Sequence, residues 1–127
     1  MSNPNRPLSP HLQVYKPQLT SMLSIAHRLT GMVLAAGVVV FTIWLYLVTT
    51  QAAAADQLAA FFAQGLGAVL LFAWLFTFNY HLCNGIRHLF WDAGKGYDIP
   101  TVYKTGTLVI IVAVLLTAGE IYWGYVS

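Results

Sequence analysis

Two groups of polar residues stand out in a chain that is otherwise rich in apolar side chains. They are Ser24-Ile-Ala-His27-Arg28-Leu-Thr30-Gly31 and His81-Leu-Cys-Asn84-Gly85-Ile-Arg87-His88. Each group lies at one end of a long uncharged stretch, and polar residues at membrane depth are candidates for function. Imidazole and guanidinium groups can bind a metal-containing cofactor or stabilise a developing negative charge. We therefore take these two groups as the candidate functional residues.

Two histidines of the second group share one face of the predicted helix. His81 and His88 are separated by about 700° of helical rotation and about 10 Å along the axis. Gly85 lies between them on that face, and its small size leaves a gap for a flat ring. The pattern suits a haem whose iron is bound by His81 and whose propionates meet His88 or Arg28. The alternative is that His81 only forms a hydrogen bond to a neighbouring helix.

The chain is expected to supply one axial ligand to such a haem. His27 is placed beside Arg28 near the membrane interface, whereas His81 is expected to lie about 10 Å deeper. Two imidazoles so far apart in depth do not easily bind one iron. The remaining histidine, His11, lies in a proline-rich segment. A six-coordinate haem would therefore take its second ligand from another subunit.

The composition places these residues in a membrane protein. Hydrophobic residues make up 58% of the chain and charged residues 8%, whereas about 25% are charged in an average soluble domain. Residues 29–55, 57–86 and 105–119 contain no Asp, Glu, Lys or Arg, and a spanning helix needs about 20 apolar residues. The sequence therefore predicts an all-α integral membrane protein. The same composition excludes a soluble domain. A nucleic-acid-binding protein is excluded because there is no basic patch. A Cys-rich metal site is excluded because Cys83 is the single cysteine.

Four segments are expected along the chain. They are an N-terminal cytoplasmic arm over 1–28 and transmembrane helices over 29–50, 60–88 and 104–126. Cationic residues before the first helix and between the last two place the N-terminus in the cytoplasm and the C-terminus in the periplasm. The arm is too rich in proline for a long helix and is expected to dock on a soluble partner. Ser21 or Ser24 is expected to cap the first transmembrane helix.

Further expectations concern two charged residues and the ends of the chain. Arg87 is expected to reach the headgroups as a snorkelling side chain. Glu120 is expected to reach the outer interface, and the alternative is a role in a proton path. No removable signal or transit peptide is recognised. We therefore expect a complete chain, located in a bacterial inner membrane, or in the mitochondrial inner membrane if it is organelle-encoded.

Three motifs resemble the signatures of one protein family. They are Arg6-Pro-Leu-Ser-Pro-His-Leu-Gln-Val-Tyr15, Ser24-Ile-x-His27-Arg28-x-Thr30-Gly31 and His81-x-x-x-Gly85-Ile-Arg87-His88-Leu-x-x-Asp92. Because the three motifs occur in this order and the chain has three predicted spans, the sequence resembles the cytochrome b556 subunits of succinate dehydrogenase. These are the larger of the two small membrane anchors of respiratory complex II. The arm is most similar to that of alphaproteobacterial and mitochondrial members.

The resemblance implies a cofactor, a substrate and a set of partners. It implies one haem b, shared with a second small anchor subunit, with His81 as the ligand to iron. His27, Arg28 and His88 are implied to lie near the propionates, and Ser24 and Arg28 to line a pocket for ubiquinone. Electrons would arrive from succinate through a flavoprotein subunit and an iron–sulfur subunit. The chain itself has no flavin motif and no cysteine cluster, so it does not oxidise succinate alone.

One interpretation from a different class stays open. The chain could be a haem-free structural anchor that attaches a peripheral complex to the membrane without contact to quinone. A transporter or channel subunit is disfavoured, because the polar residues gather at one end of the predicted spans instead of lining them. A reduced-minus-oxidised spectrum of purified membranes would separate a cytochrome from a haem-free anchor.

Overall fold

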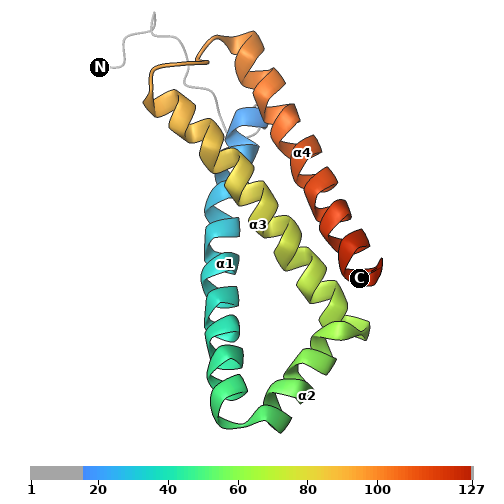
Figure 1. The fold of residues 1–127 in the computed structure, drawn as a ribbon. Helices are drawn as coiled ribbons and strands as arrows, with labels where there is room; N and C mark the ends of the chain where they lie inside the picture. The colour runs from blue at the N-terminus through green and yellow to red at the C-terminus, as the bar shows by residue number, and fades with distance from the viewer. Residues whose placement is uncertain (1–15, 127) are drawn as a thin grey trace, which may run out of the picture.

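The computed structural model describes residues 16–126, and over this range the chain forms four α-helices (Figure 1). They are α1 (Leu19–Thr50), α2 (Ala52–Ala63), α3 (Gly65–Asp92) and α4 (Ile99–Val126). By length and composition, α1, α3 and α4 are long and apolar enough to cross a membrane. The predicted all-α fold with three apolar spans is confirmed. The orientation of the two ends and the limits of the membrane segments stay predictions.

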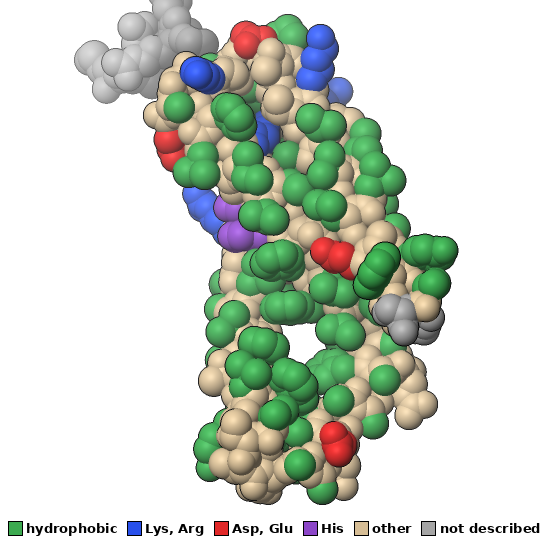
Figure 2. Space-filling model, viewed as in Figure 1, with side chains coloured by type: hydrophobic (Ala, Val, Ile, Leu, Met, Phe, Trp, Pro, Cys, Tyr) green, Lys and Arg blue, Asp and Glu red, His purple; other side chains and the backbone are tan. Residues whose placement is uncertain are grey.

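The helix α3 lies between α1 and α4 (Figure 1). α1 and α3 come together near the start of α1 and separate towards the other end, where α2 connects them. Most of the Lys and Arg side chains visible in Figure 2 lie at the end where α3 is joined to α4. The three histidines described below lie closer to this charged end than to α2.

The helix α1 begins earlier than predicted. It starts at Leu19, and Gln18 occupies the N-cap position without a side-chain hydrogen bond. Neither Ser21 nor Ser24 caps the helix, because both lie inside it. No proline follows Leu19 in this segment, so the helix extends into residues that were assigned to the arm. As a result His27 lies about two turns inside α1.

The first loop contains a helix that the sequence analysis missed. The segment of α2 is rich in alanine, which has the highest helix propensity. α2 approaches α3 very closely, because a Cβ atom on Gly67 would lie 1.9 Å from the carbonyl oxygen of Phe61. Gly65 begins α3 with a φ of 56°, which only glycine adopts readily. The two glycines therefore allow the sharp change of direction between α2 and α3.

The packed core lies where the three long helices meet. Its buried apolar residues are Leu23, Tyr80, Val109 and Ala113. The Tyr80 hydroxyl donates a hydrogen bond of 2.8 Å to the carbonyl oxygen of Leu23. A Cβ atom on Gly106 would lie 2.8 Å from the Cδ1 atom of Leu23, so the glycine allows α4 to pack against α1. These contacts set the level of α1 relative to α3 and α4.

The connection between α3 and α4 is the predicted glycine-containing turn. Gly94 and Gly96 have φ angles of 74° and 80°, which glycine adopts without strain. Asp98 caps the start of α4, because its Oδ2 atom accepts a hydrogen bond of 3.1 Å from the backbone N–H of Thr101. Hydrogen bonding to Thr101 lowers the pKa of the Asp98 carboxyl group and so favours its charged form.

Candidate functional site

Three histidines from two helices form one group, here termed the histidine cluster. It consists of His27 on α1 and of His81 and His88 on α3. The rings of His27 and His81 are stacked, with centroids 3.9 Å apart and an angle of 11° between their planes. The ring centroids of His27 and His88 are 5.1 Å apart. His81 and His88 thus both face His27, which agrees with their predicted place on one face of α3.

The predicted difference in depth between His27 and His81 is wrong. The early start of α1 places His27 inside the helix rather than at its interfacial end. Gly31 lets α1 approach the His81 ring, because a Cβ atom there would lie 3.2 Å from Cε1 of His81. A Cβ atom on Gly85 would lie 3.8 Å from Cε1 of His27. The expected gap beside Gly85 is therefore filled by an imidazole of the same chain.

The orientation of His81 is set by contacts at its Nδ1 atom. This atom lies 3.1 Å from the carbonyl oxygen of His27 and 3.0 Å from Oγ1 of Thr30. The Thr30 hydroxyl itself donates to the same carbonyl over 2.9 Å. A proton on Nδ1 that points at the carbonyl leaves Nε2 of His81 free to accept a metal. The ring of His27 is stacked face to face on that of His81.

An open hollow of about 380 Å³ lies next to the histidine cluster, between α1 and α3, and is here termed the α1–α3 hollow. It is lined by Thr20, Ser21, Ser24, Ile25, Arg28, His88 and Trp91. Ser24 and Arg28 both reach it, in agreement with their predicted common face, because four residues turn a helix by about 400°. Three hydroxyls, a cation and an imidazole meet apolar side chains here. Figure 2 shows histidine side chains beside a cationic one at this level. A concave site with a few convergent polar groups is typical of small-molecule binding.

The comparison with known proteins assigns this chain to a family. Residues 2–119 match the family described as succinate dehydrogenase/fumarate reductase transmembrane subunit. The chain belongs to this family. Its relatives include the succinate dehydrogenase cytochrome b556 subunit of Rickettsia prowazekii, which is 45% identical over 88% of this chain and 87% of the relative. The cytochrome b556 subunit of Paracoccus denitrificans is 41% identical over 88% of this chain and 86% of the relative.

A mitochondrial relative supports the same assignment. The succinate dehydrogenase cytochrome b560 subunit of Homo sapiens is 41% identical over 91% of this chain and 69% of the relative. The resemblance predicted from the three motifs is therefore confirmed. The match includes both groups of polar residues from which the sequence analysis started.

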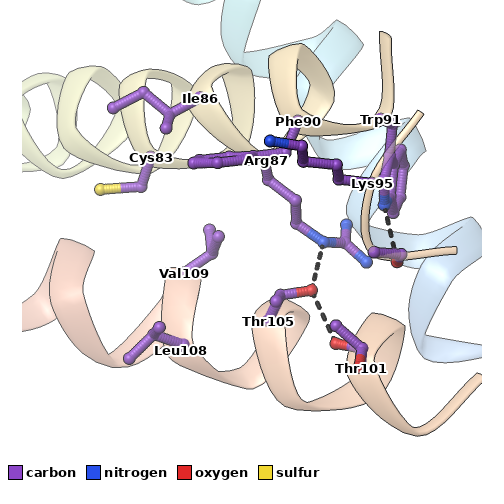
Figure 3. Close-up of a pocket in the computed structure, with 11 residues that line it drawn as sticks. Cys83, Ile86, Arg87, Phe90, Trp91, Lys95, Thr101, Thr105, Leu108 and Val109 are labelled. Atoms are coloured by element: carbon purple, nitrogen blue, oxygen red, sulfur yellow. Dashed lines mark hydrogen bonds between the residues drawn. The ribbon is translucent and has the colours of Figure 1, made fainter. Parts of the chain in front are cut away.

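In this member of the family, Arg87 does not snorkel. Its side chain is 6% exposed and points between α3 and α4 (Figure 3). Nε donates to Oγ1 of Thr105 over 3.1 Å, and Nη2 donates to the carbonyl oxygen of Val102 over 2.9 Å. Nη1 donates to Oδ1 of Asn84 over 3.3 Å, and Cζ lies 4.1 Å from the ring centroid of Trp91. The prediction failed because these partners on α4 are distant in sequence.

A cleft of about 310 Å³ lies between α3 and α4, and is here termed the α3–α4 cleft (Figure 3). Most of its walls are apolar or aromatic side chains, namely Cys83, Ile86, Phe90, Trp91, Leu108 and Val109. Cys83 packs against the core, which agrees with its prediction as a small apolar side chain. Arg87 and Lys95 line the same cleft.

A further polar contact joins α3 and α4 on the side away from the turn. Asn79 is 2% exposed, and its Nδ2 atom donates to Oγ1 of Thr117 over 3.1 Å and to Oε2 of Glu120 over 2.8 Å. The Thr117 hydroxyl donates to the carbonyl oxygen of Ala113 over 2.8 Å. Glu120 was expected only at the outer interface, and its bond to α3 was not predicted. The sequence signal for this contact was the presence of two polar residues, Asn79 and Thr117, within the predicted transmembrane helices.

Proposed function

We propose that this chain is the membrane-anchor cytochrome b subunit of a succinate:ubiquinone oxidoreductase. In this proposal it binds one haem b and forms part of the ubiquinone-reduction site. Its family, and relatives named as succinate dehydrogenase cytochrome b subunits, support the anchor and haem roles. The observation that carries the quinone part is the α1–α3 hollow, where Ser24, Arg28 and His88 converge beside the histidine cluster.

The residues of the histidine cluster fit a haem. His81 would hold the iron through Nε2, because its Nδ1 atom already contacts the carbonyl oxygen of His27. Nδ1 of His27 is buried without a hydrogen-bond partner, and such an atom favours an added polar group. His27, Arg28 and His88 would therefore hold the propionate carboxylates. When bound, the haem supplies one-electron redox chemistry.

The second axial ligand would come from a second small anchor subunit. His27 is the nearest imidazole to His81 in the described chain, and its ring is stacked flat on that of His81. With the two rings stacked, His81 alone of this pair would hold the iron, which favours a haem shared between two chains.

The residues of the hollow would bind and orient the quinone ring. The Ser24 hydroxyl would donate a hydrogen bond to a quinone carbonyl oxygen. The Arg28 guanidinium would stabilise the negative charge that develops there. Removal of one such donor from a site of low polarity typically costs about 3 kcal/mol of transition-state stabilisation. Ile25 and Trp91 would exclude water from the ring. The iron–sulfur and flavoprotein subunits would supply the electrons from succinate.

The proposed orientation places the charged end of the molecule in the cytoplasm. This end carries the turn between α3 and α4 (Figure 1), and the hollow lies near it because His88 and Trp91, close to the end of α3, line the hollow. Soluble subunits could then deliver electrons directly to the hollow. The C-terminal end of α4, with the exposed Tyr122 and Trp123, would face the periplasm, where aromatic side chains suit the interface.

The experiment compares two reactions of the assembled complex. In Ser24→Ala and Arg28→Lys we expect ubiquinone reduction to fall about 100-fold, because lysine lacks the planar fork of arginine. Succinate oxidation by an artificial acceptor that takes electrons upstream should stay near normal. Thr49→Ala on the same helix is the matched control, because its hydroxyl bonds only the local backbone of Tyr46. Equal losses in both reactions, at equal amounts of complex, would contradict the quinone site.

A further inference from the structure

Among the residues that the structure describes, Trp91 is the one side chain that lines both the α1–α3 hollow and the α3–α4 cleft. It is the second-last residue of α3, next to the turn that leads into α4. The indole therefore separates the proposed quinone site from the cavity between α3 and α4.

Both sides of the indole are in contact with a functional group. The ring of His88 meets it edge to face, with centroids 5.0 Å apart and an angle of 87° between the planes. On another side, the guanidinium carbon of Arg87 lies 4.1 Å from the ring centroid. Edge-to-face and cation–π contacts are each specific in geometry. Trp91 thus links a histidine of the hollow to a buried cation.

The turn after α3 holds the indole in place. Nε1 of Trp91 donates to the carbonyl oxygen of Gly96 over 3.2 Å, as Figure 3 shows. The Tyr97 ring lies 6.3 Å from the indole with an angle of 18° between the planes. The Tyr97 hydroxyl donates to the carbonyl oxygen of Trp91. With its ring faces and its N–H all engaged, the indole has little freedom to move.

No anion of the described residues is hydrogen-bonded to Arg87, so its positive charge is not neutralised at this point. Its hydrogen-bond partners are the hydroxyl of Thr105, the amide oxygen of Asn84 and the carbonyl of Val102, and all of them are uncharged. A buried cation without a paired anion acts over a longer distance than an exposed one, because less solvent screens it. Negative charge in the hollow would therefore be stabilised by Arg28 at contact and by Arg87 across the indole.

We propose that Trp91 is a positioning residue for quinone reduction. Clamped by Arg87 and by the turn after α3, the indole forms a wall of the hollow and sets the position of the His88 ring. This inference rests on the proposed function, because it assumes that the hollow takes a quinone. It adds the residue that shapes the site and the buried charge behind it.

The test measures the KM for a short-chain ubiquinone in the assembled four-subunit complex. Trp91→Leu should raise this KM about tenfold, which corresponds to the roughly 1.4 kcal/mol at the upper end of an aromatic contact. Trp91→Phe should recover most of the loss, because a phenyl ring still meets His88 and Arg87. Succinate oxidation by an upstream acceptor should be unchanged in both. Trp44→Leu is the matched control, since this tryptophan lies towards the other end of α1.

Each outcome decides between the inference and the proposed function. If Ser24→Ala is selectively impaired in quinone reduction while Trp91→Leu keeps its KM within about twofold of the unchanged complex, only the role of Trp91 is overturned. If neither variant is selective, the proposed quinone site itself fails. Should Trp91→Leu not assemble, Trp91→Met decides, because methionine fills much of the space but has no ring to meet His88 and Arg87. A lower yield with an unchanged KM in Trp91→Met would show a merely structural role and overturn the inference.

Discussion

At the scale of single residues, the site depends on which ring nitrogens are already engaged. The Nδ1 atom of His81 contacts a backbone carbonyl, whereas Nδ1 of His27 is buried without a partner. The first arrangement is typical of a histidine that binds a metal through Nε2. The second is typical of a group that receives a further polar ligand. The two neighbouring imidazoles therefore have different proposed roles.

This difference predicts distinct haem phenotypes for two histidines. His81→Tyr should abolish the low-spin b-type spectrum of the assembled complex, because the iron loses its ligand from this chain. His88→Ala should keep a b-type band, because only a propionate contact is lost. Reduced-minus-oxidised spectra of both variants check this. A native spectrum in His81→Tyr together with a lost band in His88→Ala would mean that the two roles are reversed.

At the scale of helices, polar contacts set how α3 lies on α4. Arg87 bonds the first turns of α4, and Asn79 bonds Thr117 and Glu120 nearer its end. Between these two points the contact is apolar, with Val109 and Ala113 in the core. Apolar packing in a bilayer has no hydrophobic driving force, so polar contacts contribute much to the specificity of helix pairing. The two polar points therefore define the register of α3 against α4.

We expect the contact between Asn79 and Glu120 to show strong coupling in a double-mutant cycle. Asn79→Leu should lower the free energy of unfolding of the complex by about 1 kcal/mol or more, because it leaves the Glu120 carboxylate without its donor. Glu120→Gln should be tolerated, since an amide oxygen still accepts the bond. In the double variant with leucine at both positions, much of the stability should return. Additive losses would contradict the coupling.

At the scale of the whole molecule, the chain leaves most of its apolar surface uncovered. Leu23 is the single buried residue of α1, and Figure 2 shows an opening through the molecule between α1 and α3 near α2. Exposed apolar residues of this kind are expected to contact lipid or partner helices. This agrees with the proposed second anchor subunit. The predicted arm spans residues 1–28, and the part over 1–15 lies outside the described residues, whereas the part from Leu19 onward belongs to α1.

Removal of the arm tests its role in assembly. Leu8, Leu12, Val14 and Tyr15 are apolar and would otherwise face water. Deletion of residues 2–15 should release the hydrophilic subunits, so that succinate dehydrogenase activity appears in the soluble fraction. The haem spectrum of the membranes is the control, because α1 begins only at Leu19. Unchanged membrane-bound activity would count against docking by the arm.

The sequence by itself determined the features that depend on local geometry. The three apolar spans follow from the positions of ten charged residues, because a charge inside a bilayer is costly. The common face of Ser24 and Arg28, and that of His81 and His88, follow from the helical repeat. The motifs also indicated the family. Helical periodicity fixes the angle of a side chain around its own axis, and this is why these predictions agree with the structure.

Only the tertiary structure decided which side chains meet across helices. The stacking of His27 on His81 depends on the level of α1 relative to α3, which is set by the packing of Leu23 against Tyr80 and Gly106. The burial of Arg87 depends likewise on how far α4 is shifted along α3. The periodicity of one helix carries no information about its axial offset from another. That offset results from the balance of packing and polar contacts over the whole molecule.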